Sequence, residues 1–287
     1  QDGSLLRTYK TISAQSSVLA RYNHAGTVVA TTSKDNTVRF WDTQTGKEVK
    51  QLQIPNCTWS LLAEWSADDK FIAISVIQNQ IPTIKLYNSS TYAEVFSADG
   101  TTHNFSSISK FGFNSTSDKL ITINDKNVVD IWSITSGSKL GGYFGCSDFA
   151  INTNTNVLYL AKADSIEEID ANVGIQKRIL RCGRPTSKLT ISPDNSLLAS
   201  VYNNANNTSV NDVLVYQTST GNRYCSVPTK VPFINAVFAK NNAVLAGVAN
   251  GNAAQTFNLP SGTLQRTYKG HENNITALSI SGDASLL

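Results

Sequence analysis

The residue types that most often carry out chemistry are few in this chain and widely separated. Three histidines occur, at His24, His103 and His271. None of them has a cysteine, a serine in a nucleophile turn or a carboxylate at a spacing that would support a catalytic base or a metal ligand. The histidines therefore predict neither catalytic residues nor a metal site.

Two pairs of adjacent acids and one glycine-rich segment also lack the features of a reactive site. Asp68 and Asp69 fall in a predicted turn, whereas Glu167 and Glu168 are neighbours in a predicted strand and point to opposite faces. The segment 141–145 lacks the Lys-Ser/Thr ending and the following helix of a phosphate loop. We expect no enzymatic activity, no cofactor and no small-molecule substrate.

The four cysteines predict neither a zinc site nor a disulfide framework, because they lie far apart and form no CxxC pair. This pattern favours an intracellular compartment, cytoplasmic or nuclear. The longest apolar runs have the length of strands, so no membrane partner is expected. The net charge of +3 is not gathered into a basic run, so RNA stays an alternative partner that the composition does not indicate.

Many short strands must position these residues, because the chain is rich in Asn, Ser and Thr and only 16% of it is charged. Residues 33–46 have the pattern of a turn, a strand and a second turn closed by glycine. An aromatic or apolar anchor followed five positions later by glycine recurs along the chain. These pairs are Trp41 and Gly46, Trp132 and Gly137, Ile169 and Gly174, Tyr216 and Gly221, Phe257 and Gly262, with Tyr87 and Tyr92 lacking the glycine.

The six anchors are 37 to 47 residues apart, and this period is typical of propeller blades with four short strands each. We name the strands of a blade a to d. The predicted blades span approximately residues 11–53, 54–99, 100–145, 146–184, 185–229 and 230–269. Residues 1–10 supply an outer strand d, and residues 270–287 a strand a and the start of a strand b. We expect one propeller domain over 1–287 that is part of a longer chain.

Three segments carry a family resemblance. Residues 37–42 resemble strand c of the WD40 repeat, Gly270-His271 its GH dipeptide, and Ser192-Pro193-Asp194 its first turn. The resemblance implies an all-β, WD40-type β-propeller of seven four-stranded antiparallel blades, the seventh incomplete in this chain.

The same resemblance implies structural roles for several residues in the family's buried hydrogen-bonded tetrad. No single repeat contains the whole tetrad, so we expect these blades to depend more on apolar packing. The residues concerned are Ser33, Asp35, Trp41, Trp132 and His271.

Candidate binding residues lie on the rim that the b–c and d–a connections share, which we call the top rim. The insertions at 76–82 and 203–212 are both b–c connections. Aromatic and cationic side chains on a rigid rim are typical binding anchors. The predicted set is Trp59, Phe105, Arg184, Lys188, Lys230 and Phe233. As an alternative, Trp59 and Phe105 begin strand a and pack between blades.

The resemblance implies a noncatalytic scaffold that binds other proteins within a larger intracellular assembly. Two alternatives stay open. One is a receptor for a peptide motif in a central top pocket, dominated by Arg184 or Lys188. The other is a component of a ribonucleoprotein, such as a ribosome-biogenesis complex, that uses the modest basic excess.

Overall fold

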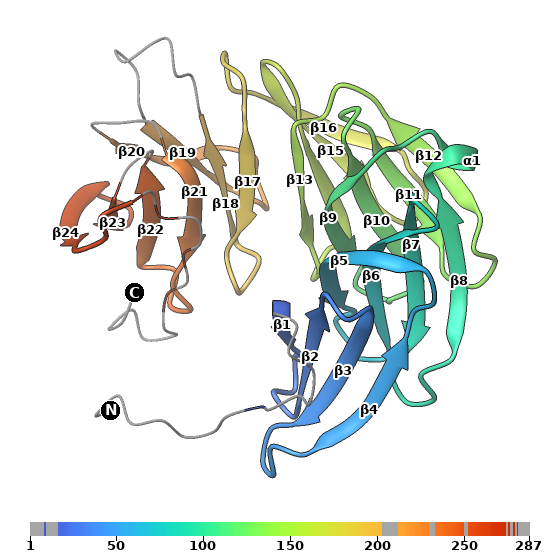
Figure 1. Cartoon of the computed structure of the whole chain (residues 1–287). Coiled ribbons are helices and arrows are strands. Elements are labelled where there is room, and N and C mark those ends of the chain that lie inside the picture. The colour runs from blue at the N-terminus through green and yellow to red at the C-terminus, as the bar shows by residue number, and fades with distance from the viewer. Residues whose placement is uncertain are drawn as a thin grey trace. The chain divides into compact units, whose positions relative to one another are not determined.

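The computed structural model describes residues 9, 17–202, 212–229, 233–249, 252–273, 275, 278 and 280 (Figure 1). Within these residues the chain forms 24 strands and one four-residue helix. The strands make six four-stranded antiparallel sheets, one for each predicted complete blade. The segments 1–8 and 281–287, which belong to the predicted seventh blade, lie outside the described residues.

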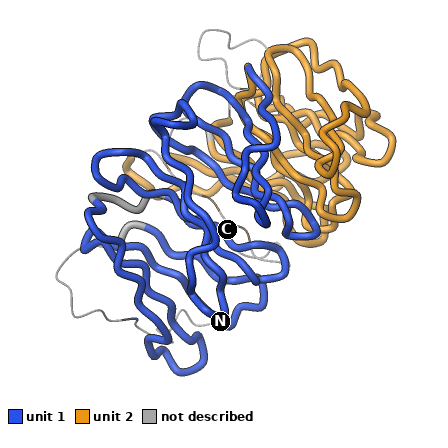
Figure 2. Tube along the Cα trace, turned by 90° about the vertical axis from the view of Figure 1, so that its right-hand side faces the viewer, with its two compact units in different colours: residues 1–144 blue, residues 145–287 orange. Residues whose placement is uncertain are grey.

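The chain divides into two compact units, Gln1–Phe144 and Gly145–Leu287 (Figure 2). Unit 1 contains blades one to three and unit 2 contains blades four to six. The division falls next to the predicted boundary between the third and fourth blades. The organisation as one domain stays a prediction.

In unit 1, blade one consists of β1 (Ser17–Tyr22), β2 (Val28–Ser33), β3 (Thr37–Asp42) and β4 (Glu48–Gln53). Blade two consists of β5 (Cys57–Trp65), β6 (Phe71–Gln78), β7 (Ile81–Asn88) and β8 (Glu94–Asp99). Blade three consists of β9 (Ile108–Phe113), β10 (Lys119–Asn124), β11 (Val129–Ser133) and β12 (Lys139–Tyr143). The helix α1 (Gly100–His103) lies between β8 and β9.

In unit 2, blade four consists of β13 (Asp148–Asn152), β14 (Val157–Ala161), β15 (Ser165–Asp170) and β16 (Gln176–Arg181). Blade five consists of β17 (Lys188–Ile191), β18 (Leu197–Val201), β19 (Asp212–Gln217) and β20 (Arg223–Pro228). Blade six consists of β21 (Phe233–Phe238), β22 (Val244–Ala249), β23 (Ala253–Asn258) and β24 (Thr263–Lys269).

Every sheet is a meander in which strands a to d are neighbours in order. The first strands contact one another within each unit: β5 contacts β1 and β9, and β17 contacts β13 and β21. The fourth strands are sheet edges. This order places the b–c and d–a connections at one rim, as predicted, and the a–b and c–d turns at the opposite rim, which we call the bottom rim.

The predicted insertion at 76–82 is not a loop, because it extends a hairpin. Strands β6 and β7 stay paired up to Gln78 and Ile81. Asn79 and Gln80 form the two-residue turn, with φ of 51° and 66°, and a positive φ at both central residues matches the twist of the paired strands. The second insertion, 203–212, lies outside the described residues except for Asp212.

The c–d turn closes with the same hydrogen bond in all six described blades. The residue five positions after the strand-c anchor has φ between 58° and 73°. Its N–H donates to the carbonyl oxygen four residues earlier, at 2.8 or 2.9 Å. Glycine adopts this left-handed conformation without strain, which explains the repeated spacing of five. Tyr92 adopts it without being glycine.

Space also requires glycine at several of these turns. A Cβ on Gly137 would lie 2.9 Å from the Cβ of Phe96 in β8, and a Cβ on Gly262 would lie 2.5 Å from the carbonyl oxygen of Ser226 in β20. In both cases the neighbour belongs to strand d of the preceding blade. The turn is therefore a point of contact between consecutive blades.

Replacing Gly262 with Ala is expected to destabilise the protein more than replacing Gly183 with Ala. Both glycines have φ of +67°, but only Gly183 has open space around its Cα. The conformational strain alone costs about 1–2 kcal/mol. The clash with the Ser226 carbonyl adds to this at Gly262. Urea unfolding would measure both variants, and equal losses would contradict the account.

Blades one to three each bury a charged residue of strand c two positions before the anchor. Each of these residues pairs with the first residue of strand d in the same blade. The pairs are Arg39 with Glu48 (3.4 Å), Lys85 with Glu94 (2.8 Å) and Asp130 with Lys139 (2.6 Å). The signs are reversed in blade three, so this position requires a matched pair and not a particular charge.

Replacing Lys139 with Ala is expected to lower the free energy of unfolding at neutral pH by on the order of 3 kcal/mol, because Asp130 stays buried without its counter-ion. Burial already raises the pKa of Asp130 above its ordinary 3.8. The folded protein then binds the proton more tightly than the unfolded chain, so stability recovers as pH falls through the folded-state pKa toward 3.8.

The control is the double variant Asp130→Asn/Lys139→Ala, which removes both charges and is expected to lack this recovery. Denaturant unfolding between pH 4 and 8 would compare the variants. An equal loss for Lys139→Ala at every pH would mean that Asp130 is not the group responsible.

Candidate functional site

Two of the predicted binding residues are buried. Phe105 is 4% exposed and Phe233 is 1% exposed. Phe105 packs in a cluster with Trp132, and the Phe233 ring lies 5.8 Å from that of Phe257. Both side chains stand at or near the start of strand a, where they pack inside their own unit. Their predicted role as exposed anchors is therefore wrong, and packing, the alternative considered for Phe105, is found.

Arg184 is committed to an internal contact. Its Nη1 pairs with Oδ1 of Asp212, and its guanidinium lies 5.5 Å from the centre of the Tyr202 ring. Only 15% of its side chain is exposed. The contact fixes the d–a connection to the two ends of the 203–211 segment. Lys188, at the start of β17, is exposed.

The binding roles predicted for the remaining two residues, Trp59 and Lys230, stay predictions. Trp59 lies in β5, but its side chain is outside the described part of the chain. Lys230 lies wholly outside it.

The two tryptophans of strand c, for which we predict a structural role, lie in the interior of their blades. Both are buried, and the indole Nε1 of each donates to a threonine of strand b: Trp41 to Thr31 at 2.8 Å, and Trp132 to Thr122 at 3.0 Å. The acceptor in blade one is thus Thr31, not the predicted Ser33. Trp41 lies opposite Val29 in the sheet, and Thr31 is its diagonal neighbour, whereas Ser33 is four residues from Val29 and out of reach.

Asp35 stabilises the b–c turn of blade one, since it accepts from the N–H of Thr37 and pairs with Arg39 at 2.9 Å. His271 is exposed. A contact that the sequence did not predict involves His103, whose ring lies 4.9 Å from that of Trp132, edge to face. The histidine that packs on a strand-c tryptophan is therefore at the end of α1.

An open groove of about 610 Å³ lies on the top rim of unit 1. Three segments form it: the tip of the β6–β7 hairpin, α1 with the connection to β9, and the b–c turn of blade three. We call it the top groove. Its lining consists of Ile77, Gln80, Ile81, Pro82, Gly100, Thr101, Asn104, Phe105, Ser106 and Lys126.

Hydrogen bonds hold the walls of the top groove in place. Asp99 caps α1 by accepting from the N–H of Thr102 at 2.8 Å. Oδ1 of Asp125 accepts from the N–H groups of Ser106 and Ser107 at 2.8 and 3.0 Å. The d–a connection is thereby tied to the b–c turn of blade three, and the groove needs little ordering before it binds a partner.

The chemistry of the top groove suits a segment that combines apolar and acidic side chains. Ile77, Ile81 and Pro82 are partly exposed and apolar. Lys126 is the one charged residue among those that line the groove, and its Nζ donates to Oδ1 of Asn104. The insertion at 76–82 was the sequence signal for this site, while Asn104 and Lys126 gave none.

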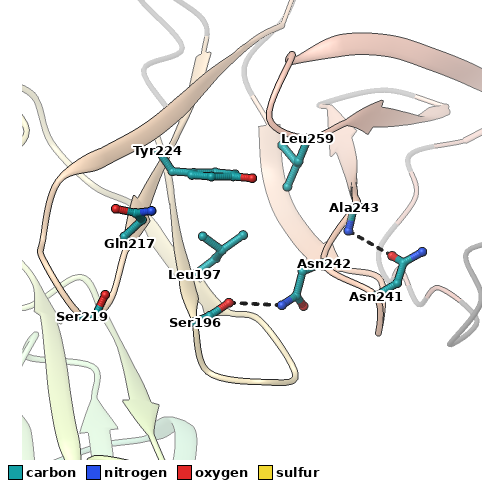
Figure 3. Close-up of a pocket in the computed structure, with 9 residues that line it drawn as sticks. All are labelled: Ser196, Leu197, Gln217, Ser219, Tyr224, Asn241, Asn242, Ala243 and Leu259. Carbon is teal, nitrogen blue, oxygen red and sulfur yellow. Dashed lines mark hydrogen bonds between the residues drawn. The ribbon is translucent and has the colours of Figure 1, made fainter.

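A second hollow, of about 370 Å³, lies on the bottom rim of unit 2 between blades five and six. Asn242 donates to Oγ of Ser196 at 3.2 Å and so links the two blades there (Figure 3). The lining has no charged side chain that would orient a ligand. It consists of Ser196, Leu197, Gln217, Ser219, Tyr224, Asn241, Asn242, Ala243 and Leu259.

The family model described as "WD domain, G-beta repeat" matches residues 3–42 and 262–287. The two matched segments confirm the resemblance to the WD40-repeat family. The matched segments include both regions assigned to the incomplete seventh blade and the repeat that contains Trp41. Together with the six four-stranded sheets, this match confirms the predicted fold class, all-β and of the WD40 β-propeller type.

No curated protein gives a significant match to the sequence. WD40 domains are in general noncatalytic scaffolds that bind other proteins. Among the described residues of the chain, no helix has the length and apolar character needed to cross a bilayer.

Replacing Arg184 with Ala is expected to lower the free energy of unfolding by about 1–2 kcal/mol, because the change removes an ion pair and a cation–π contact that are largely shielded from water. Replacing the exposed Lys188 with Ala should change it by less than about 0.5 kcal/mol. Thermal and urea unfolding would test both. An Arg184→Ala variant of unchanged stability would show that the arginine is not a structural contact.

Proposed function

We propose that this WD40 protein is a noncatalytic scaffold of a larger intracellular assembly, and that its top groove binds an extended segment of a partner protein. The observation that carries the proposal is the groove itself. It is concave and lies on the top rim, where the connections between strands differ most from blade to blade. Its walls are tied together by Asp99 and Asp125.

The mixture of side chains in the groove supports a peptide segment as the ligand. Apolar residues at its floor and walls provide surface to bury, and Gln80, Thr101 and Ser106 provide polar groups at its edges. Rigid loops keep the ordering cost of such an interface low. We expect Lys126 to exchange its contact with Asn104 for a carboxylate of the partner.

The two alternative functions have less support. A receptor dominated by Arg184 would require a side chain that is instead paired with Asp212. A ribonucleoprotein role would require several phosphate contacts, and the top groove offers one lysine.

The charge-reversing substitution Lys126→Glu is expected to weaken partner binding by about tenfold, since one favourable charge contact becomes repulsive. Lys47→Glu is the matched control, because Lys47 is an exposed lysine of the same unit on the bottom rim. Quantitative affinity capture of the full-length parent protein, followed by mass spectrometry, would compare the three proteins.

The expected result is the loss of a defined subset of partners with Lys126→Glu and their retention with Lys47→Glu. Unchanged partner sets for both variants would overturn the role of the top groove. Partners that disappear after nuclease treatment would point to RNA instead.

A further inference from the structure

The c–d turn and outer strand of blade four depart from the pattern that the other five described blades share. Three positions there carry β-branched apolar residues: Val173, Ile175 and Ile179. Their exposed fractions are 66%, 64% and 40%. Counted from the strand-c anchor, the corresponding residues in the other blades are polar or small. They are Thr45, Thr91, Ser136, Thr220 and Ser261 at the first position; Lys47, Ala93, Ser138, Asn222 and Thr263 at the second; and Gln51, Ser97, Gly142, Ser226 and Thr267 at the third.

Folding gives no reason for this departure. At the first position a hydroxyl elsewhere completes the turn, as where Thr45 donates to Asp42 at 2.7 Å and Thr91 donates to Asn88 at 3.1 Å. Val173 cannot make this bond. The two isoleucines place apolar surface in water, which the hydrophobic effect disfavours. Exposed apolar surface gathered in one place marks an interaction site.

The backbone at this place is also open to a partner. Strand β16 is the last strand in the order β13-β14-β15-β16, so one side of it has no neighbouring strand in its sheet. Two of the other five outer strands carry features that discourage pairing: β20 ends in Pro228, and β12 contains Gly141 and Gly142. Strand β16 contains the β-branched Ile179, a residue type that favours cross-strand packing.

The charge of this edge is positive. Two of its cations are neutralised within the blade, since Lys177 pairs with Asp170 at 2.9 Å and Arg178 with Glu168 at 2.8 Å. Arg181 is exposed, and no carboxylate of the described chain forms an ion pair with it under 4.0 Å. A partner with an acidic residue at this end of the strand would supply the missing charge.

We propose that the blade-four edge, residues 173–181, accepts an extended segment of a partner protein as a fifth strand, and that this segment carries an apolar and an acidic residue two positions apart, on the face that meets Ile179 and Arg181. Main-chain hydrogen bonds to β16 would give affinity, and the isoleucines and Arg181 would give specificity. A second copy of this chain does not fit. Two β16 strands side by side would bring Lys177 and Arg181 of both copies together, and like charges on paired strands repel.

This edge lies in unit 2 and is independent of the top groove of unit 1. The probe is a fluorescent eight-residue peptide in which Glu and Val or Ile alternate at every second position, with Thr at the positions between them, so that one face carries both residue types. A peptide of the same composition, with its acidic residues in one block and its apolar residues in another, is the control for alternation. Fluorescence anisotropy would measure binding to the full chain.

We expect the alternating peptide to bind, and the double variant Ile175→Thr/Ile179→Thr to bind it about tenfold more weakly. Threonine keeps the strand propensity and the exposed positions, so folding should be preserved, and circular dichroism would check it. The matched control is Val49→Thr, since Val49 is an exposed residue of the outer strand β4 in unit 1. It should leave affinity unchanged.

Arg181→Glu provides a second readout. It should weaken binding of the acidic peptide and improve binding of the same peptide with Lys in place of Glu. Hydrogen exchange should show that the peptide protects amides of Gln176–Arg181.

Three outcomes would overturn the proposal. They are no binding of the alternating peptide, equal affinity of the native chain and the double variant, and protection of β16 that increases with protein concentration in the absence of peptide. The last outcome would make a second copy the occupant.

Discussion

A single main-chain hydrogen bond, repeated in all six described blades, is the constraint on which the rest of the structure depends. It closes each c–d turn through a residue in the left-handed conformation. At Gly137, Gly221 and Gly262 it also brings that residue against the outer strand of the blade before it. One local bond therefore ends a hairpin and sets the distance to the next sheet. Tyr92 keeps the conformation without glycine, and its ring packs 4.7 Å from that of Phe40.

The sequence predicts the blades well because this constraint is local. A turn that needs glycine five residues after a buried anchor leaves the same spacing wherever it occurs, as at Trp41 and Gly46. The β6–β7 hairpin could not be predicted in this way, because its turn places Gln80 at a positive φ, and glutamine gives no signal for that conformation. Thr31, and not Ser33, accepts the hydrogen bond from the Trp41 indole because of the strand register, which depends on pairing between strands.

The candidate site was predicted only in part, because exposure depends on contacts between segments far apart in sequence. Aromatic and cationic side chains on the top rim were a reasonable signal, yet Phe233 fills space over Gly247 and Arg184 pairs with Asp212. What the sequence did show was where blades depart from their shared pattern. The lengthened hairpin of blade two became a wall of the top groove. In a repeat protein the shared positions maintain the fold, so the positions that differ between blades are free to serve binding.

The reversed ion pair of blade three has a further consequence for folding. Repeats of similar length and pattern can exchange strands while the chain is still assembling, and repeat proteins misfold in this way. If strand d of blade two paired with strand c of blade three, Glu94 would meet the buried Asp130, and Lys139 would meet Lys85 in the reciprocal error. Each exchange would bury two like charges. The reversed sign in blade three therefore disfavours the exchange of outer strands between blades two and three.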